Sequence, residues 1–147
     1  MQERRLSFGP AAATYEAFRP DYPAQLPAVV LAYADQPVRT ALEIGAGTGK
    51  ATRLFATAGI AVTASDPDPE MLALLRSRVP DVSATIEASL ETLPETGHRY
   101  DLVFVAAALH WTAPEGRWRC ISTLLRPAGT FVAIGGAIAL ADSALES

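Results

Sequence analysis

The sequence has only one cysteine, Cys120, so no disulfide can form within the chain, and a reducing compartment suits it. It also lacks an excess of positive charge: the formal net charge is -4 at pH 7, whereas a protein that binds nucleic acid needs a basic face. No apolar run is long enough to cross a bilayer or to form a signal peptide. We therefore expect a cytoplasmic protein whose partners include neither nucleic acid nor a membrane.

What the sequence does contain is an alternation of strand-like and helix-like segments. Half of the residues are hydrophobic, and 147 residues are enough for one domain with a buried core. Apolar runs predict the strands, and apolar residues at helical spacing predict the helices between them. Strands are expected at 40–46, 60–67, 82–88, 100–109 and 130–136, and helices at 48–59, 68–79 and from 114 until Pro127 and Gly129. This order predicts an α/β fold with a doubly wound, mostly parallel sheet.

The two ends of the chain are expected to flank the core at 40–136. Residues 1–39 carry a proline-punctuated start and an apolar segment suited to a helix, and we interpret them as a lid or helical segment. Residues 137–147 are expected to form a short helix or a tail. The fifth strand would then be an apolar edge without a neighbour, which invites pairing with a second copy of the chain or with a partner chain.

A glycine-rich turn follows the first expected strand in ALEIGAGTGK (41–50), with glycines at three alternate positions. Because glycine has no side chain, a backbone of this kind lets a ligand approach closely at the carboxyl edge of a sheet. The phosphate-binding loop of ATPases does not fit, because Ile44 replaces its first glycine and Ala51 its Ser or Thr. The dinucleotide fingerprint G-x-G-x-x-G fits less well, because Lys50 stands at its third glycine. A plain turn needs one glycine, so three favour a ligand.

The stretch LEIGAGTGK resembles the first motif of class I S-adenosylmethionine-dependent methyltransferases, in the small-molecule, type 11-like branch. The resemblance implies a Rossmann-like fold in which this sequence lacks a counterpart of the last two of the family's seven strands. It also implies S-adenosyl-L-methionine as the cofactor. Glu43 would interact with the methionine moiety, and the loop backbone would pack against the amino-acid end and the ribose. The loop residues with this implied role are Gly45, Ala46, Gly47 and Gly49.

The stretch ASDPDPEML extends the resemblance at the end of the second strand. Asp66 stands where a carboxylate can accept hydrogen bonds from both ribose hydroxyls. NAD-binding folds use an acidic residue in the same way, so Asp66 alone does not discriminate between the two classes. Pro67 and Met71 continue a pattern familiar in methyltransferases and are implied to line the cofactor site. Asp68 is expected to cap the helix that follows.

Two further stretches resemble the family's adenine-binding and methyl-transfer segments. In EASLETLP, Ser89 and Leu90 would hold the adenine, although Ser89 replaces the family's Asp and forms a weaker hydrogen bond. In YDLVFVAAALHWT, Ala106 would line the site, and His110 and Trp111 would lie at its mouth. His110 is a candidate general base; alternatively it caps the strand end and shapes the pocket.

The stretch FGPAAATYEAFRPDYP (8–23) resembles the leader of the small-molecule branch. By this resemblance Tyr15, Arg19 and Tyr22 belong to a lid over the cofactor, on the acceptor side of the site. The alternative is that the two prolines in this stretch simply start a helix that packs on the sheet.

Together these motifs predict a methyltransferase that uses S-adenosyl-L-methionine and transfers its methyl group to a small-molecule acceptor by in-line displacement. The alternative is a catalytically incomplete cofactor-binding module or fragment that pairs through its open sheet edge. An NAD-dependent oxidoreductase is disfavoured by the glycine spacing. No residue pattern selects the acceptor, and we assign no metal ligands.

Overall fold

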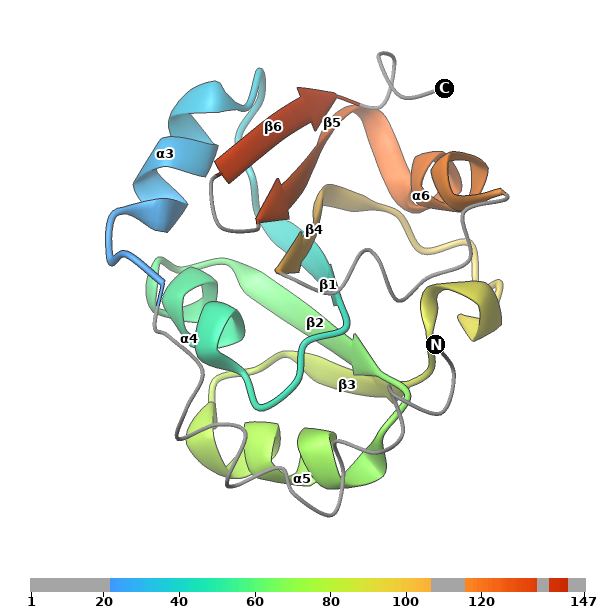
Figure 1. The fold of residues 1–147 in the computed structure, drawn as a ribbon. Coiled ribbons are helices and arrows are strands. Elements are labelled where there is room, and N and C mark those ends of the chain that lie inside the picture. Colours follow the sequence, from blue (N-terminus) through green and yellow to red (C-terminus); the bar gives the residue numbers. More distant parts are fainter. Residues whose placement is uncertain (1–21, 107–115, 135–137, 143–147) are drawn as a thin grey trace.

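A computed structural model describes residues 22–106, 116–134 and 138–142 (Figure 1). Six strands form one sheet in the order β3-β2-β1-β4-β5-β6, in which the first five strands are parallel and β6 is antiparallel. The strands are β1 (Thr40–Ile44), β2 (Ala61–Asp66), β3 (Ala84–Glu87), β4 (Tyr100–Ala106), β5 (Leu125–Ile134) and β6 (Ile138–Asp142). The helices are α3 (Leu26–Tyr33), α4 (Lys50–Thr57), α5 (Pro69–Arg78) and α6 (Arg117–Leu124), with a 3-10 helix η1 (Leu90–Thr92). The predicted doubly wound α/β sheet is confirmed.

The central strand β4 is apolar from Leu102 to Ala106 because both faces of the sheet are covered there. In β4, Leu102 and Phe104 pack with Phe55 of α4 and Leu26 of α3 on one face. Val103 belongs to the second cluster, on the opposite face, where η1 and α6 pack. Figure 1 shows α3 and α4 on one side of the sheet and α6 and η1 on the other. This two-sided burial explains why the sequence of β4 does not alternate between polar and apolar residues.

The chain winds in two directions from the middle of the sheet. The connection from β1 through α4 leads to β2 on one side of β1, and the connection from β4 through α6 leads to β5 on the far side of β4. Since β1 and β4 are neighbours, the winding reverses between them. In open α/β sheets, ligands bind beyond the carboxyl ends of the strands at this reversal. The loop at 45–49 follows the carboxyl end of β1 directly and lies at that point.

The start of β5 differs from its prediction. The sequence predicts a helix up to Pro127 and a strand from Thr130, whereas α6 ends at Leu124 and β5 already begins at Leu125. The pairing with β4 is interrupted there, since Tyr100 pairs with Leu125 and the regular register resumes at Thr130. The regular part of the strand therefore begins where predicted, and the early part is an irregular extension.

The end of the chain corrects two predictions. The structure places Ile138–Asp142 as β6, antiparallel to β5, with Thr130 opposite Asp142 and Ile134 opposite Ile138. The expected short helix or tail is therefore wrong for these residues, and so is the open edge on the fifth strand. One antiparallel strand fills the place beside β5 where the family resemblance would put a hairpin.

The segment before the sheet contains a helix, as expected, in the part of it that the structure describes. The described residues from Tyr22 onward include α3, which begins with Pro27 in its first turn and packs Leu26 and Val30 into the core. Val29, on the same helix, is 42% exposed. None of the helices described here has both the length and the apolar character needed to cross a membrane.

Candidate functional site at the carboxyl edge of the sheet

The loop after β1 adopts a conformation that favours glycine. Gly45, Gly47 and Gly49 have φ angles of 65°, 61° and 96°, all in the left-handed region, which side chains rarely adopt. A Cβ atom on Gly49 would also lie 2.9 Å from the Cγ of Leu75 and 2.9 Å from a Cγ of Val79. The third glycine is therefore required for close packing of the loop on α5, independently of any ligand. Gly45 and Gly47 are the two that remain for ligand approach.

Asp66 joins the glycine loop to the end of β2. Its carboxylate Oδ2 accepts a hydrogen bond from the backbone N–H of Gly47 at 3.0 Å, and Oδ1 accepts one from the N–H of Asp68 at 2.9 Å. The residue is 8% exposed. The backbone N–H of Ala88 also donates to the Asp66 carbonyl at 3.1 Å, which brings the end of β3 to the same point. Three separate parts of the chain thus converge on Asp66, two of them on its carboxylate and one on its backbone carbonyl.

Glu43 is almost completely buried, with 1% exposure, in the space between β1 and α4. Its Oε1 accepts a hydrogen bond from the Thr52 hydroxyl at 2.5 Å, and its carbonyl accepts one from the Ser65 hydroxyl at 2.8 Å. The side chain therefore fixes the first turn of α4 beneath the glycine loop. Sequence reasoning missed Thr52 and Ser65, which lie in the helix predicted at 48–59 and in the strand predicted at 60–67.

Ser89 and Leu90 lie at the start of η1. The Ser89 N–H donates to the Thr92 hydroxyl at 2.9 Å, and the two hydroxyl groups share a hydrogen bond at 3.1 Å. The Ser89 hydroxyl is thus part of a reciprocal cap with Thr92, whereas Leu90 is 4% exposed within the core cluster beneath the sheet. Both residues follow Ala88, whose N–H donates to the Asp66 carbonyl where β2 and β3 end.

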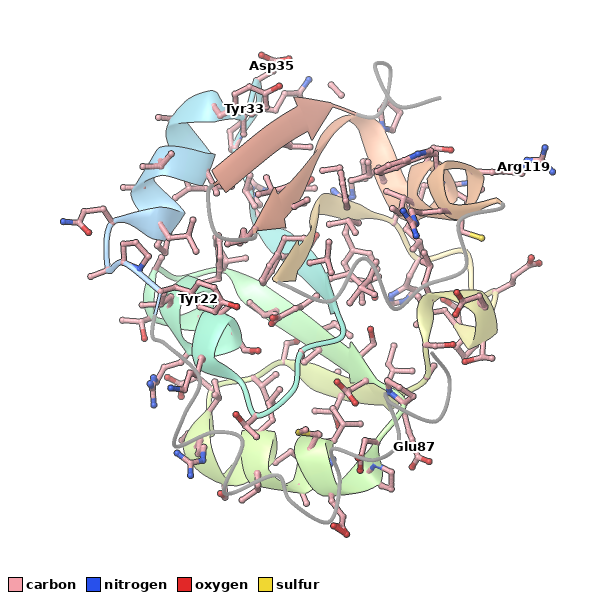
Figure 2. The ribbon with its side chains drawn as sticks, viewed as in Figure 1. Tyr22, Tyr33, Asp35, Glu87 and Arg119 are labelled. Atoms are coloured by element: carbon pink, nitrogen blue, oxygen red, sulfur yellow. The ribbon has the colours of Figure 1, made fainter. Side chains whose placement is uncertain are left out.

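The remaining predicted site residues are placed in different ways. Ala46 and Met71 are buried at 1% and 2% exposure, and Pro67 is half-buried between the two aspartates. Ala106 is the last residue of β4. Tyr22 packs against the core cluster that contains Leu26 and Phe55, and Figure 2 shows it beside α4. Four predicted residues lie outside the part of the chain that is described: Tyr15, Arg19, His110 and Trp111.

Asp68 has a second property that sequence reasoning did not find. It caps α5 as predicted, because its Oδ1 accepts a hydrogen bond from the Glu70 N–H at 2.9 Å. The residue is 3% exposed, and its other oxygen, Oδ2, is buried without a hydrogen-bond partner among the residues that the structure describes. A buried acceptor without a donor is costly and rare, so it needs an explanation.

A cavity of about 390 Å³ lies on the face of the sheet that η1 and α6 cover, between η1, the loop before β4 and α6. Leu42, Leu90, Tyr100 and Leu124 contribute to its walls, and neither the glycine loop nor Asp66 does. Leu90 is the only predicted cofactor residue that lines it. We therefore place the candidate site at the carboxyl edge rather than in this cavity.

The chain also matches known proteins. A model of the methyltransferase domain family (Methyltransf_11) matches residues 42–133, which include the glycine loop, both aspartates and η1. An uncharacterized methyltransferase of Mycobacterium tuberculosis is 38% identical over 128 residues, which cover 87% of this chain and 51% of that protein.

Two solved structures share the fold. The CcbJ methyltransferase from Streptomyces caelestis has a TM-score of 0.71 at 25% identity, over 88% of this chain and 57% of that one. CalS10 bound to S-adenosylmethionine, an amino pentose methyltransferase from Micromonospora echinaspora, has a TM-score of 0.66 at 27% identity, over 75% and 48%. The chain spans about half the length of the relatives it matches. On the strength of the family match, which covers most of the sheet, the chain belongs to the class I S-adenosylmethionine-dependent methyltransferases, in the type 11 branch.

Proposed function

We propose that the chain binds S-adenosyl-L-methionine at the carboxyl edge of its sheet and takes part in methyl transfer to a small-molecule acceptor. The observation that carries the proposal is the position of Asp66, which is held beside the glycine loop by the N–H groups of Gly47 and Asp68. Such a buried, oriented carboxylate is suited to two-point hydrogen bonding with a ribose diol. The methyltransferase family of the chain supports the same ligand.

The residues around Asp66 would then divide the cofactor between them. Gly45 and Gly47 present bare backbone, with left-handed φ angles, to the ribose and the amino-acid end. Leu90 and Pro67 flank the carboxyl ends of β2 and β3 and would contact the adenine. Glu43 would act through α4, because its carboxylate is engaged by Thr52 beneath the loop.

The bound cofactor would supply a sulfonium methyl group that is already activated, so the acceptor forms a bond to carbon while sulfur retains the electrons of its broken bond. The protein's own task is then to position the acceptor and exclude water. We propose that His110 takes up the proton that the acceptor loses, if the acceptor carries one. Tyr15, Arg19, Tyr22 and Trp111 are proposed for the acceptor side.

A small-molecule acceptor is supported by two observations. The net charge of -4 does not favour nucleic acid as the acceptor, because a nucleic-acid-binding protein needs a basic face. CalS10, which shares the fold, is an amino pentose methyltransferase. Neither observation selects the atom that receives the methyl group.

Calorimetric titration with S-adenosylhomocysteine tests the proposal. Wild type should bind, and Asp66→Ala should lower the affinity roughly 10- to 100-fold, the usual value of hydrogen bonds to a charged group. Asp81→Ala is the matched control, because Asp81 is an exposed carboxylate in the turn after α5. Absence of binding by folded wild type would refute the proposal, and so would equal affinities for the two variants.

A second candidate is a cofactor-binding module without turnover that pairs with another chain. The observation that favours it is the outer edge of β6, which pairs with no further strand among the described residues. Because β5 is paired with β6, the edge available for such pairing would be that of β6. Incubation with a panel of small-molecule acceptors separates the candidates: a module binds S-adenosylhomocysteine without forming a methylated product, and its mass in solution exceeds that of one chain.

A further inference from the structure

Helix α3 differs from the other described helices in having no charged side chain among its eight residues. A helix that is apolar all round is normally covered on all sides. Only one side of α3 is buried, where Leu26 and Val30 enter the core. The large apolar side chains that are exposed in the described part of the chain all lie on this helix: Val29, Leu31 and Tyr33, at 42%, 37% and 38% exposure. The exposed side of α3 is therefore suited to contact with another apolar surface.

This helix lies close to the open edge of the sheet. It packs on Val132 and Ile134 of β5, and Ile134 pairs with Ile138 of β6. The other edge of β6 pairs with no further strand among the described residues. Figure 1 shows α3 and β6 at the same corner of the molecule, and Figure 2 shows Tyr33 there. The exposed residues of α3 and the outer edge of β6 thus lie together, and we call them the α3–β6 surface.

The charge of this surface favours a second copy of the chain as its partner. In a twofold interface the same patch meets itself, so a charged patch repels its copy, whereas an uncharged apolar patch is complementary to itself. A partner of another kind is commonly selected through opposite charge, and α3 offers none. Asp142, the charged residue of β6, stands at the end of the strand, so an axis near the middle of the strand keeps its two copies apart.

We propose that a second copy of the chain covers α3 about a twofold axis and continues the sheet at the edge of β6. A strand related to its copy by an axis perpendicular to the sheet runs antiparallel to it, and an unpaired edge is a template for such pairing. Burial of the apolar side chains of both copies would drive the association. The inference does not rest on the proposed function, because the exposed residues of α3 do not belong to the candidate site.

Light scattering after size exclusion, over a wide range of protein concentrations, tests the proposal. Wild type should reach twice the mass of one chain. Val29→Glu should raise the dissociation constant about 100-fold or more, because the symmetry places two uncompensated carboxylates in the interface. The variant should still fold, since Val29 is exposed in one chain and glutamate favours a helix. Ala73→Glu is the matched control: it puts a carboxylate on an exposed position of α5 and should leave the dimer unchanged.

Two further measurements locate the contact. The Tm of wild type should rise with protein concentration, because only folded chains associate, and the Tm of Val29→Glu should not. Hydrogen exchange at the amides of β6 should be slower in wild type than in Val29→Glu at the same concentration, because pairing across the axis protects them.

The outcomes decide between this partner and others. A wild type that has the mass of one chain at every concentration would refute the proposal, and α3 would then be left to another part of the chain or to a different protein. A dimer whose dissociation constant is the same for wild type and Val29→Glu would refute it as well, since the copies would meet elsewhere. Equal exchange at β6 would refute the pairing of the strands. Should Val29→Glu not fold, Ala32→Glu takes its place, because Ala32 is exposed on the same helix.

Discussion

Aspartate side chains are paired differently at the two ends of the parallel strands, which we call the amino edge and the carboxyl edge. At the amino edge, Asp101 Oδ2 accepts hydrogen bonds from the N–H groups of Arg39 and Thr40 at 2.9 and 3.1 Å. Its Oδ1 lies 3.7 Å from a guanidinium nitrogen of Arg126. Both oxygens of Asp101 therefore have partners on β1 and β5. At the carboxyl edge, Asp66 binds the glycine loop and Asp68 keeps one buried oxygen without a partner.

This difference supports the proposal that the amino edge serves the fold and that the carboxyl edge binds the cofactor. The partners of Asp101 join neighbouring strands, so this carboxylate contributes to the fold. A buried carboxylate whose donors are incomplete leaves hydrogen-bonding capacity for another molecule. We therefore expect substitutions at the amino edge to change the free energy of unfolding, and those at the aspartates of the carboxyl edge to change the affinity for the cofactor.

The largest expected effect tests whether part of the glycine loop serves the fold. Gly49→Ala should lower the free energy of unfolding by about 2–4 kcal/mol, because it adds strain at a left-handed φ to a clash with Leu75 and Val79. Gly59→Ala is the matched control: its φ is 92°, and nothing lies within 4 Å of the added Cβ. It should cost about 1–2 kcal/mol. Equal losses in urea unfolding would show that packing on α5 is not what requires Gly49.

The next effect is at the amino edge. Asp101→Asn should lower the free energy of unfolding by about 1–2 kcal/mol, because a neutral amide replaces the charged acceptor of two backbone N–H groups. Its affinity for S-adenosylhomocysteine should stay within about twofold of wild type, because Asp101 lies at the opposite edge. If Asp101→Asn were as stable as wild type, Asp101 would not stabilise the fold, and the difference between the two edges would be contradicted.

The smallest expected effect is a pH dependence of the free energy of unfolding that comes from the Asp101 carboxylate. Burial raises the pKa of Asp101, but the N–H groups of Arg39 and Thr40 and the charge of Arg126 outweigh it and hold the pKa below the ordinary value of 3.8. Because the folded pKa is lowered, its contribution to stability is complete above pH 3.8 and is lost as the pH falls through the folded value. Urea unfolding from about pH 6 to about pH 2.5 should show wild type and Asp101→Asn converging at the acid end. A constant difference would contradict this account.

The sequence was sufficient for the features that depend on local pattern. The five parallel strands follow from apolar runs separated by helical spacing, and the cap by Asp68 follows from its position before Pro69. The position of Asp66 at the end of β2 was also predictable, because parallel strands bring successive carboxyl ends to one edge.

The features that were missed depend on partners distant in the sequence. Residues 138–142 form a strand because β5 offers an unpaired edge, and a short apolar segment does not reveal this by periodicity. Burial of Glu43 against Thr52 depends on how α4 packs on β1. The unpaired oxygen of Asp68 is visible only once every neighbour is in place. The local sequence pattern was thus enough to predict the sheet. Which carboxylate oxygens have hydrogen-bond partners could be seen only in the structure.

The central claim is that cofactor binding belongs to the carboxyl edge and not to the sheet as a whole. Its most direct test is the affinity for S-adenosylhomocysteine, measured by calorimetry, of Asp66→Asn beside Asp101→Asn. Asp66→Asn should bind about tenfold more weakly or worse, whereas Asp101→Asn should bind as wild type does. If Asp101→Asn lost as much affinity as Asp66→Asn while remaining folded, or if neither variant lost any, the division between the two edges would be contradicted.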